Sequence, residues 1–569
     1  MTHQLWQCFV YTIFKITMHP DPQLTPFQLL DNLLRTTVDD LVATSSGTGS
    51  TQILAMLKVA DLQSELCKRP FAGLKKQAVG PANSMTRALG LLLPRMVAVV
   101  DSASPMMPKE RIQFEAARDS LSLVGQLISF REMAKAADYG LTTCRMLGPA
   151  EVELIAEAVD EEAVEHADRN ALLDGMHGDR GELAKILVQR TNRMHSYNQL
   201  RGYAGTDAQF DAYVELGREW LEFFMPEYAE ADAYAGTTRI GLLTFAQWKS
   251  VVVNVCAIGF AYAEQEDAAR DMRGWNTPGH FLSIPPSRIS AQQLRTAFAV
   301  AGIPDQQELY TQIAECLILD ASNALVDYGA DGAVPILVRI GEDVFMPRYA
   351  RNGNPYMFLV SRLAKVYSRD AKRMGQEREP KFVCDLKNLL GNDNYIFGME
   401  RVDIFVNKIP LTDIDAVVYE KHTGSLYLIQ LKWLAVHAHD LERREKQYDE
   451  LCKVGIWIDK MQDWIDRMPS QKILAHVGLG DAGIDTETLN IRLVVLNRWW
   501  TRYSGKPAFP AGAVWMSWSR LGWLVRNAHD QVSPFSAAWE EAKVLRPGLP
   551  KKGKRFRRQF PGLTVWVEQ

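Results

Sequence analysis

Residues 1–329 carry apolar side chains at three- and four-residue spacing, which is typical of amphipathic helices packed on a core. Glycine, proline and serine separate these stretches. The pattern predicts helices at residues 27–41, 113–137, 151–166, 207–224 and 245–263. We therefore expect residues 1–329 to form one or more α-helical domains.

The pattern changes after residue 329, where short apolar runs with alternating polar positions become frequent. Residues 330–375 are expected to connect two parts of the chain through a hairpin, with strands at 334–339 and 343–346, and a helix at 355–372. Beyond them the sequence predicts a helix at 380–390, strands at 402–406, 414–420, 425–432 and 491–496, and helices at 440–468 and 517–527. Strands interleaved with helices indicate an α/β domain with a mixed central sheet over residues 376–530. The fold class is thus α+β and multidomain.

Residues 411–433 contain two β-rich runs around a short polar turn, the pattern of a β-hairpin. We expect Glu420 to pair with Ser425, so the numbers of any two opposed residues sum to 845. A slip of one residue would move half of the polar side chains to the other face of the hairpin. The register is therefore a geometric prediction.

Four polar residues gather at one end of this hairpin. The register places Asp415 opposite Gln430 and Asp413 opposite Lys432, and the alternation of side chains puts all four on one face. Directly opposed Cβ atoms lie about 4.5–5.5 Å apart, close enough for both strands to share a cation. An ordinary salt bridge between Asp413 and Lys432 is the alternative. Burying two carboxylates and a lysine among apolar residues is costly without a partner or a metal, which favours a functional site.

These residues resemble the motif of the PD-(D/E)xK, or restriction-endonuclease-like, nuclease superfamily. In that family an aspartate on one strand and an acid-x-Lys triad on the next strand bind Mg²⁺. Here fourteen residues separate Asp415 from the triad Gln430-Leu431-Lys432. Glutamine replaces the usual acid, a substitution that the family tolerates, but it offers a neutral oxygen. The resemblance covers residues 376–530 and implies a QxK variant of this fold.

The resemblance implies a catalytic set of Asp415, Gln430 and Lys432. Asp415 would be the principal metal ligand, and Gln430 and Asp413 would add oxygen atoms. Lys432 would position or deprotonate the attacking water, a role that desolvation favours by lowering its pKa. Because Mg²⁺ prefers oxygen ligands and keeps several waters, it is the expected metal, with Mn²⁺ as a substitute.

Members of the family also donate an acid from the helix before the sheet. Glu379 is the preferred candidate here and Asp385 is the alternative. A helix-capping role beside Pro380 is the competing interpretation of Glu379. Gln447, on the helix after the hairpin, would be a further polar group near the site or simply an exposed helix residue.

Composition narrows the choice of partners. A net charge of −4 gives no overall attraction to nucleic acid, so a binding surface must be local. Residues 551–558 hold six cations and belong to a basic extension at 531–569. This run either binds phosphates or is a solvated tail.

The cysteines indicate the compartment. Seven scattered cysteines without a CxxC pair suggest neither a zinc site nor disulfides and fit a reducing cytoplasm. The apolar segment 5–18 lacks the marks of an export signal, and we expect no membrane partner.

The leading hypothesis is a cytoplasmic, Mg²⁺-dependent nuclease that acts on nucleic acid, with DNA as the preferred substrate. Its helical region would bind a protein partner or a second copy, sense a trigger, or control access to the site. By analogy alone, a helical module joined to such a nuclease suggests a phage-defence or restriction-type effector. The alternative is a catalytically weak nuclease fold that binds nucleic acid or assembles a complex.

Overall fold

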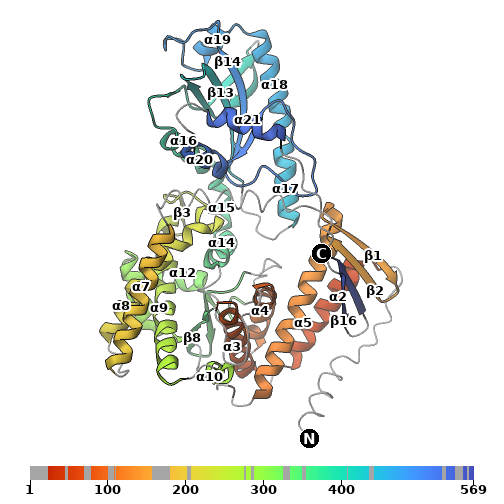
Figure 1. The fold of residues 1–569 in the computed structure, drawn as a ribbon, viewed down its shortest axis with the longest axis vertical. Helices are drawn as coiled ribbons and strands as arrows, with labels where there is room; N and C mark the ends of the chain where they lie inside the picture. Colours follow the sequence, from red (N-terminus) through yellow and green to blue (C-terminus); the bar gives the residue numbers. More distant parts are fainter. Residues whose placement is uncertain are drawn as a thin grey trace.

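The computed structural model describes residues 24–44, 49–68, 79–99, 108, 111–156, 180–201, 207–274, 277–283, 287–324, 333–348, 354–406, 408–434, 441–527, 533–544, 555–560 and 563–568. The apolar segment 5–18 and the first part of the basic run, 551–554, lie outside these residues. The fold is mixed α+β, with a region rich in helices and a lobe built on a mixed sheet (Figure 1). Among the described helices, none is both long and apolar enough to span a bilayer.

Helices dominate the N-terminal region, and most of them share one large apolar core. They are α2 (Pro26–Thr44), α3 (Gly49–Lys68), α4 (Val79–Val99), α5 (Arg111–Ala136), α7 (Arg180–Arg201), α8 (Asp207–Phe224), α9 (Phe245–Met272), α10 (Pro278–Ser283), α11 (Ala291–Val300) and α12 (Gln307–Leu317), with 3₁₀ turns η1 (Ala137–Tyr139), η2 (Met225–Glu227) and η3 (Ala229–Asp232). The helices predicted at 27–41, 113–137, 207–224 and 245–263 are confirmed as α2, α5, α8 and α9. A capping box between Thr244 and Gln247 fixes the start of α9.

The helix predicted at 151–166 is wrong in its first part, because residues 151–156 form strand β2 (Glu151–Ala156). β2 pairs with β1 (Thr142–Gly148), and Val152 and Leu154 are fully buried beneath the pair. Glu153 points to the other face, so apolar and polar residues alternate with the period of a strand. The remaining residues of the predicted helix lie outside the described part of the chain.

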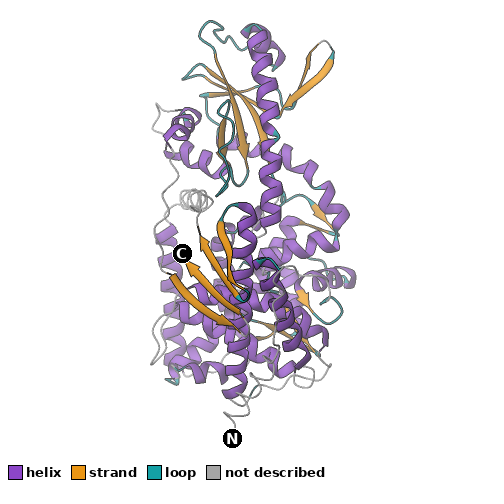
Figure 2. Cartoon of the chain, turned by 90° about the vertical axis from the view of Figure 1, so that its right-hand side faces the viewer, coloured by secondary structure: helices purple, strands orange, loops and turns teal. Residues whose placement is uncertain are grey.

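Part of the basic extension returns to this sheet. Strands β16 (Arg555–Phe560) and β17 (Leu563–Glu568) form a hairpin, and β17 runs parallel to β2, giving the strand order β1-β2-β17-β16. Figure 2 shows these strands lying against the helices of the N-terminal region. The buried carboxylate of Glu153 forms ion pairs with Arg145, whose Nε lies 2.5 Å from Oε2, and with Arg555, whose Nη2 lies 2.6 Å from Oε1. Residues 555–560 are therefore a paired strand, and the side chains at 557–559 are exposed to solvent.

A second sheet follows α10, with strand order β5-β8-β7-β6. It comprises β5 (Ser287–Arg288), β6 (Ile318–Leu319), β7 (Leu337–Ile340) and β8 (Asp343–Met346), while β3 (Arg239–Ile240) and β4 (Leu243–Thr244) form a separate pair. The predicted hairpin is confirmed, with β7 and β8 joined at residues 341–342. The helix predicted at 355–372 is divided at Tyr367 into α14 (Pro355–Val366) and α15 (Ser368–Arg373). In Figure 1 these two helices lie between the helical region and the upper lobe.

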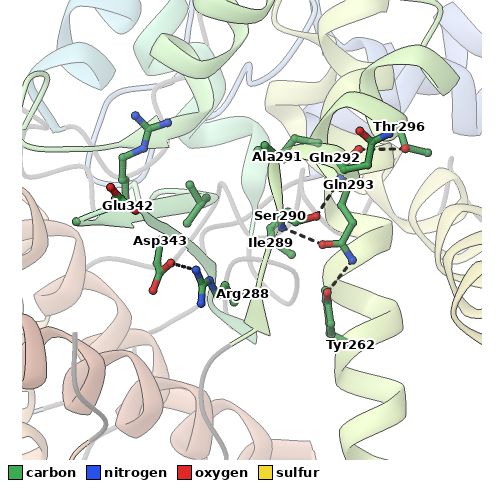
Figure 3. A pocket seen from close by; sticks show the side chains of 14 residues that line it. Tyr262, Arg288, Ile289, Ser290, Ala291, Gln292, Gln293, Thr296, Glu342 and Asp343 are labelled. Carbon is green, nitrogen blue, oxygen red and sulfur yellow. Dashed lines mark hydrogen bonds and ion pairs between the residues drawn. The ribbon is translucent and has the colours of Figure 1, made fainter. Parts of the chain in front are cut away.

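A pocket of about 920 Å³ opens beside the start of α11 and the β7–β8 turn. Figure 3 shows its polar side chains bonding to one another: Arg288 pairs with Asp343, and Gln293 contacts both Ser290 and the hydroxyl of Tyr262. The residues that line it all belong to the helical region and its second sheet. The pocket is thus separate from the residues predicted for the nuclease site.

The upper lobe is built on a five-stranded sheet with order β15-β14-β13-β12-β9. Its strands are β9 (Tyr395–Phe397), β12 (Ala416–Glu420), β13 (Ser425–Lys432), β14 (Asn490–Asn497) and β15 (Val514–Ser517), and its helices are α16 (Gly375–Leu389), α17 (Leu441–Cys452), α18 (Val454–Arg467), α19 (Ser470–His476), α20 (Trp518–Asn527) and α21 (Pro534–Val544). β13 is antiparallel to β12 and parallel to β14, so the sheet is mixed, as predicted. The helix predicted at 440–468 is divided into α17 and α18.

Two apolar layers cover the two faces of this sheet. α16, α20 and α21 pack on the face that carries Tyr427 and Ile429, and α18 and α19 pack on the face that carries Leu426 and Leu428. α21 lies beyond the predicted boundary at residue 530, yet its Phe535 is fully buried in the first layer. The alternation along β13 therefore assigns Gln430 and Lys432 to the same face as α18.

A separate hairpin stands beside the sheet, made of β10 (Val402–Val406) and β11 (Ile409–Ile414). Its inner residues Ile404 and Ile414 are buried against α18, while Phe405 and Ile409 near its turn are 49% and 69% exposed. Figure 2 shows a pair of strands standing off the side of the upper lobe. β11 leads directly into Asp415.

Candidate active site

The predicted register of the central hairpin is confirmed. Glu420 pairs with Ser425 and Ala416 with Ile429, so the opposed numbers sum to 845 along the whole ladder. Asp415 follows the last of these pairs, and its amide donates to the carbonyl of Ile429 at 3.1 Å. The side-chain amide of Gln430 donates to Oδ2 of Asp415. Asp415 and Gln430 thus face each other at the end of the ladder.

The prediction that Asp413 lies opposite Lys432 is wrong. The ladder between β12 and β13 ends at Ala416, and Asp413 pairs instead with Asp403 in β10. Its carbonyl accepts a hydrogen bond of 2.7 Å from the indole of Trp457. The chain changes partners at this point because the β10–β11 hairpin provides a second ladder, which the sequence of residues 411–433 does not reveal.

Asp415 occupies an unusual environment for a carboxylate. The residue is only 5% exposed, and burial raises its pKa to about 6 from the ordinary value of 3.8. The amide of Leu431, which donates to Oδ2 at 2.7 Å, and the charge of Lys432 lower the pKa. The charges of Glu379 and Asp413 raise it again. A buried acid with neighbouring acids and one lysine is a frequent feature of functional sites.

The two upstream candidates differ in their surroundings. Glu379 lies in α16, is exposed, and is near enough to Asp415 for its charge to raise the pKa of that group. Asp385 forms ion pairs with Lys381 at 2.5 Å and with Arg498 at 3.1 Å. Pro380 lies inside α16, so Glu379 is within the helix and not at its cap. These contacts favour Glu379 as the further acid of the site.

The strand after the predicted triad adds two residues that the sequence did not single out. In the parallel ladder Asn497 pairs with Lys432, and the next amide, that of Arg498, donates to the carbonyl of Lys432 at 2.7 Å. Asn497 is 1% exposed and Arg498 is 7% exposed. Their position becomes visible only once β14 is paired with β13, because no local motif marks them.

Gln447 was expected to be an exposed helix residue or a polar group near the site. It is buried in α17, as is Arg444 one turn earlier, whose guanidinium donates to the carbonyl of Ser504 at 2.6 Å. The exposed alternative is therefore wrong. Buried polar residues on α17 face the inside of the lobe.

Comparison of the chain with protein-family models, with curated proteins and with solved structures finds no match. The function must therefore be argued from the geometry of the site itself.

The described residues can be tested for a fit to Mg²⁺. The charges of two further carboxylates, those of Glu379 and Asp413, act on Asp415 at this end of the sheet. Within the described parts of the chain, no three His, Cys, Asp or Glu side chains form a ready cage for a metal. Mg²⁺ is usually held by one or two carboxylates and completed by water and substrate phosphate. The donor set fits a cation that binds in this open manner.

Proposed function

We propose that the upper lobe hydrolyses phosphodiester bonds of nucleic acid with the help of Mg²⁺, and that it has a restriction-endonuclease-like fold. The observation that carries the proposal is buried Asp415, held between Gln430 and the Leu431 amide beside Lys432. Burial destabilises the charged form of this carboxylate, and a bound cation would stabilise that form by replacing its lost hydration. DNA is the preferred substrate because the resemblance to PD-(D/E)xK nucleases implies it.

Each residue has a distinct role in the proposed reaction. Asp415 and Glu379 would hold Mg²⁺, with the amide oxygen of Gln430 and the carboxylate of Asp413 as further oxygen donors. Bound there, the cation would lower the pKa of a water molecule and neutralise charge on the phosphate. Lys432 would orient the attacking water and offset negative charge on the phosphate. The oxygen of that water would bond to phosphorus as the bond to the leaving sugar oxygen breaks, with the proton of the water passing to solvent and the leaving oxygen taking a proton from solvent.

A second candidate function is a nucleic-acid-binding module with weak or no catalysis. The amide N–H of Gln430, and not its oxygen, faces Asp415, so this carboxylate already has two donors. A competing donor at the principal ligand would weaken metal binding. Such a module would bind nucleic acid equally well with or without Mg²⁺.

The two candidates are separated by a cleavage assay on the full chain with labelled single- and double-stranded DNA and RNA. We expect cleavage in Mg²⁺ or Mn²⁺ and none after chelation by EDTA, with activity restored when metal is added back. Binding without cleavage in either metal would favour the second candidate. Cleavage that persists in EDTA would contradict the metal-dependent proposal.

Replacing Glu379 with glutamine should raise the Mg²⁺ concentration needed for half-maximal cleavage by about tenfold, because one carboxylate near the cation is lost. The matched control is Asp385→Asn on the same helix, whose carboxylate pairs with Lys381 and Arg498. We expect this control to leave the Mg²⁺ midpoint unchanged. A shift in the control but not in Glu379→Gln would assign the upstream acid to Asp385.

A further inference from the structure

Two contacts from β14 to β13 hold the end of the strand that carries Lys432. Asn497 pairs with Lys432, and the Arg498 amide donates to the Lys432 carbonyl at 2.7 Å. The Arg498 guanidinium then lies 4.6 Å from the ring centre of Trp433, the residue after Lys432. A cation over an indole face is an attractive and orienting contact. Arg498 therefore contacts the Lys432 carbonyl through its backbone amide and the Trp433 side chain through its guanidinium.

The side chain of Arg498 reaches out of the upper lobe to the helical region. Its Nε and Nη2 atoms lie 2.7 and 2.6 Å from Oδ2 of Asp232, the last residue of η3. Asp385 of α16 provides a second carboxylate at 3.1 Å. The Arg498 side chain is 8% exposed, so solvent screens these pairs little.

The neighbouring residues of the helical region also bind the start of α16. Arg378 donates to the carbonyl of Trp433 at 3.1 Å and to the carbonyl of Ala233 at 3.0 Å. One residue earlier, the Glu377 carboxylate accepts from the hydroxyl of Thr238 at 2.7 Å. These two residues directly precede Glu379. The stretch from Asp232 to Thr238 thus contacts both elements that supply the site.

We propose that residues 232–238 of the helical region are a positioning element for the active site. Asp232 fixes the strand end that bears Lys432 through Arg498, and Ala233 and Thr238 fix the start of the helix that bears Glu379. The inference rests on the proposed nuclease function. It makes the helical region a control element, because a ligand that shifts this stretch would displace the strand end that bears Lys432 and the start of α16.

The decisive experiment uses the full chain and the substitution Asp232→Asn, which keeps the shape of the side chain and removes its charge. We expect kcat for DNA cleavage to fall by about 10- to 100-fold, because small displacements of a reacting group have effects of this size. The KM for DNA and the Mg²⁺ midpoint should stay unchanged. Asp232→Glu, which restores the charge, should recover most of the lost kcat.

Two further variants show whether the effect comes from this contact. Arg498→Lys keeps a cation but loses the planar two-atom contact with Asp232, so it should lower kcat as Asp232→Asn does. This variant matters because Asp232 also acts on the charge of Lys249. The control is Asp343→Asn, which breaks the Arg288–Asp343 pair elsewhere in the helical region and should change nothing. An unchanged kcat in Asp232→Asn would overturn the proposal, as would a change in KM alone.

Hydrogen exchange gives a readout that does not require cleavage. In Asp232→Asn the amide of Arg498 and peptides from residues 426–434 should exchange faster, while helices α2 to α5 should exchange as in the wild type. If the wild type cuts nothing, the proposed function fails, and this measurement still decides the positioning role. Unchanged exchange at Arg498 would refute it.

Discussion

Replacing Lys432 with alanine is expected to lower the rate of nucleic-acid cleavage by about 10³-fold, because the cation that orients the attacking water and offsets charge on the phosphate is lost. The lysine is partly exposed at the end of β13, so its removal leaves no large cavity. We expect the melting temperature and the DNA affinity to stay close to those of the wild type. Single-turnover cleavage in Mg²⁺, with saturating enzyme, measures the loss directly.

The matched control for this variant is Lys421→Ala. Lys421 is an exposed lysine in the turn of the same hairpin, at the opposite end of the ladder from Asp415. Its replacement removes one positive charge from the same pair of strands and should not change the cleavage rate. Equal losses in both variants would indicate a general electrostatic effect, and an active Lys432→Ala enzyme would remove Lys432 from the mechanism.

Replacing Asp415 with asparagine is expected to abolish metal-dependent cleavage and, at alkaline pH, to stabilise the protein. Burial raises the pKa of Asp415 to about 6, so the folded state holds the proton more tightly than the unfolded chain does. Ionised Asp415 therefore destabilises the fold, with no effect below about pH 4 and the full effect above about pH 6. The rise in the pKa from 3.8 to about 6 corresponds to a loss of about 3 kcal/mol in the free energy of unfolding at alkaline pH.

Thermal melting at pH 4 and pH 8 tests whether ionised Asp415 destabilises the folded protein. The Asp415→Asn variant should melt above the wild type at pH 8, and the difference should vanish at pH 4. Added Mg²⁺ should raise the wild-type melting temperature at pH 8 and leave the variant unchanged. The control is Asp485→Asn, an exposed aspartate whose pKa is lowered by bonds from Glu487 and Thr488, which should not gain stability at pH 8. A wild type that melts higher than Asp415→Asn at pH 8 without metal would contradict the prediction.

The central hairpin was predictable because its information is local. A short turn, two β-rich runs and strict alternation determine which residue faces which, and the structure has Asp415 facing Gln430 as expected. The partner of Asp413 was not predictable in this way. Asp403 lies ten residues earlier, and only the formation of β10 and β11 reveals that the two aspartates are paired.

The contacts around Lys432 were also not predictable from the sequence, because they join residues that are far apart along the chain. Arg498 is separated from Lys432 by more than sixty residues, and Asp232 belongs to another region of the chain. A buried arginine between two carboxylates has no sequence signature, because its partners are brought together by strand order and lobe contacts. The strand at 151–156 was missed for a related reason. It pairs with the adjacent β1 on one side, but its partner on the other side, β17, lies some four hundred residues further along.

The pairing of β17 with β2 also shapes how the chain can fold during synthesis. Residues 142–156 emerge from the ribosome long before residues 563–568, so their sheet must wait for the entire upper lobe to be made. Until then, β2 presents an unpaired edge above the buried Val152 and Leu154, the kind of edge that attracts other chains. Because the β16–β17 hairpin is made last, the N-terminal region can reach its final form only after the upper lobe has been synthesised.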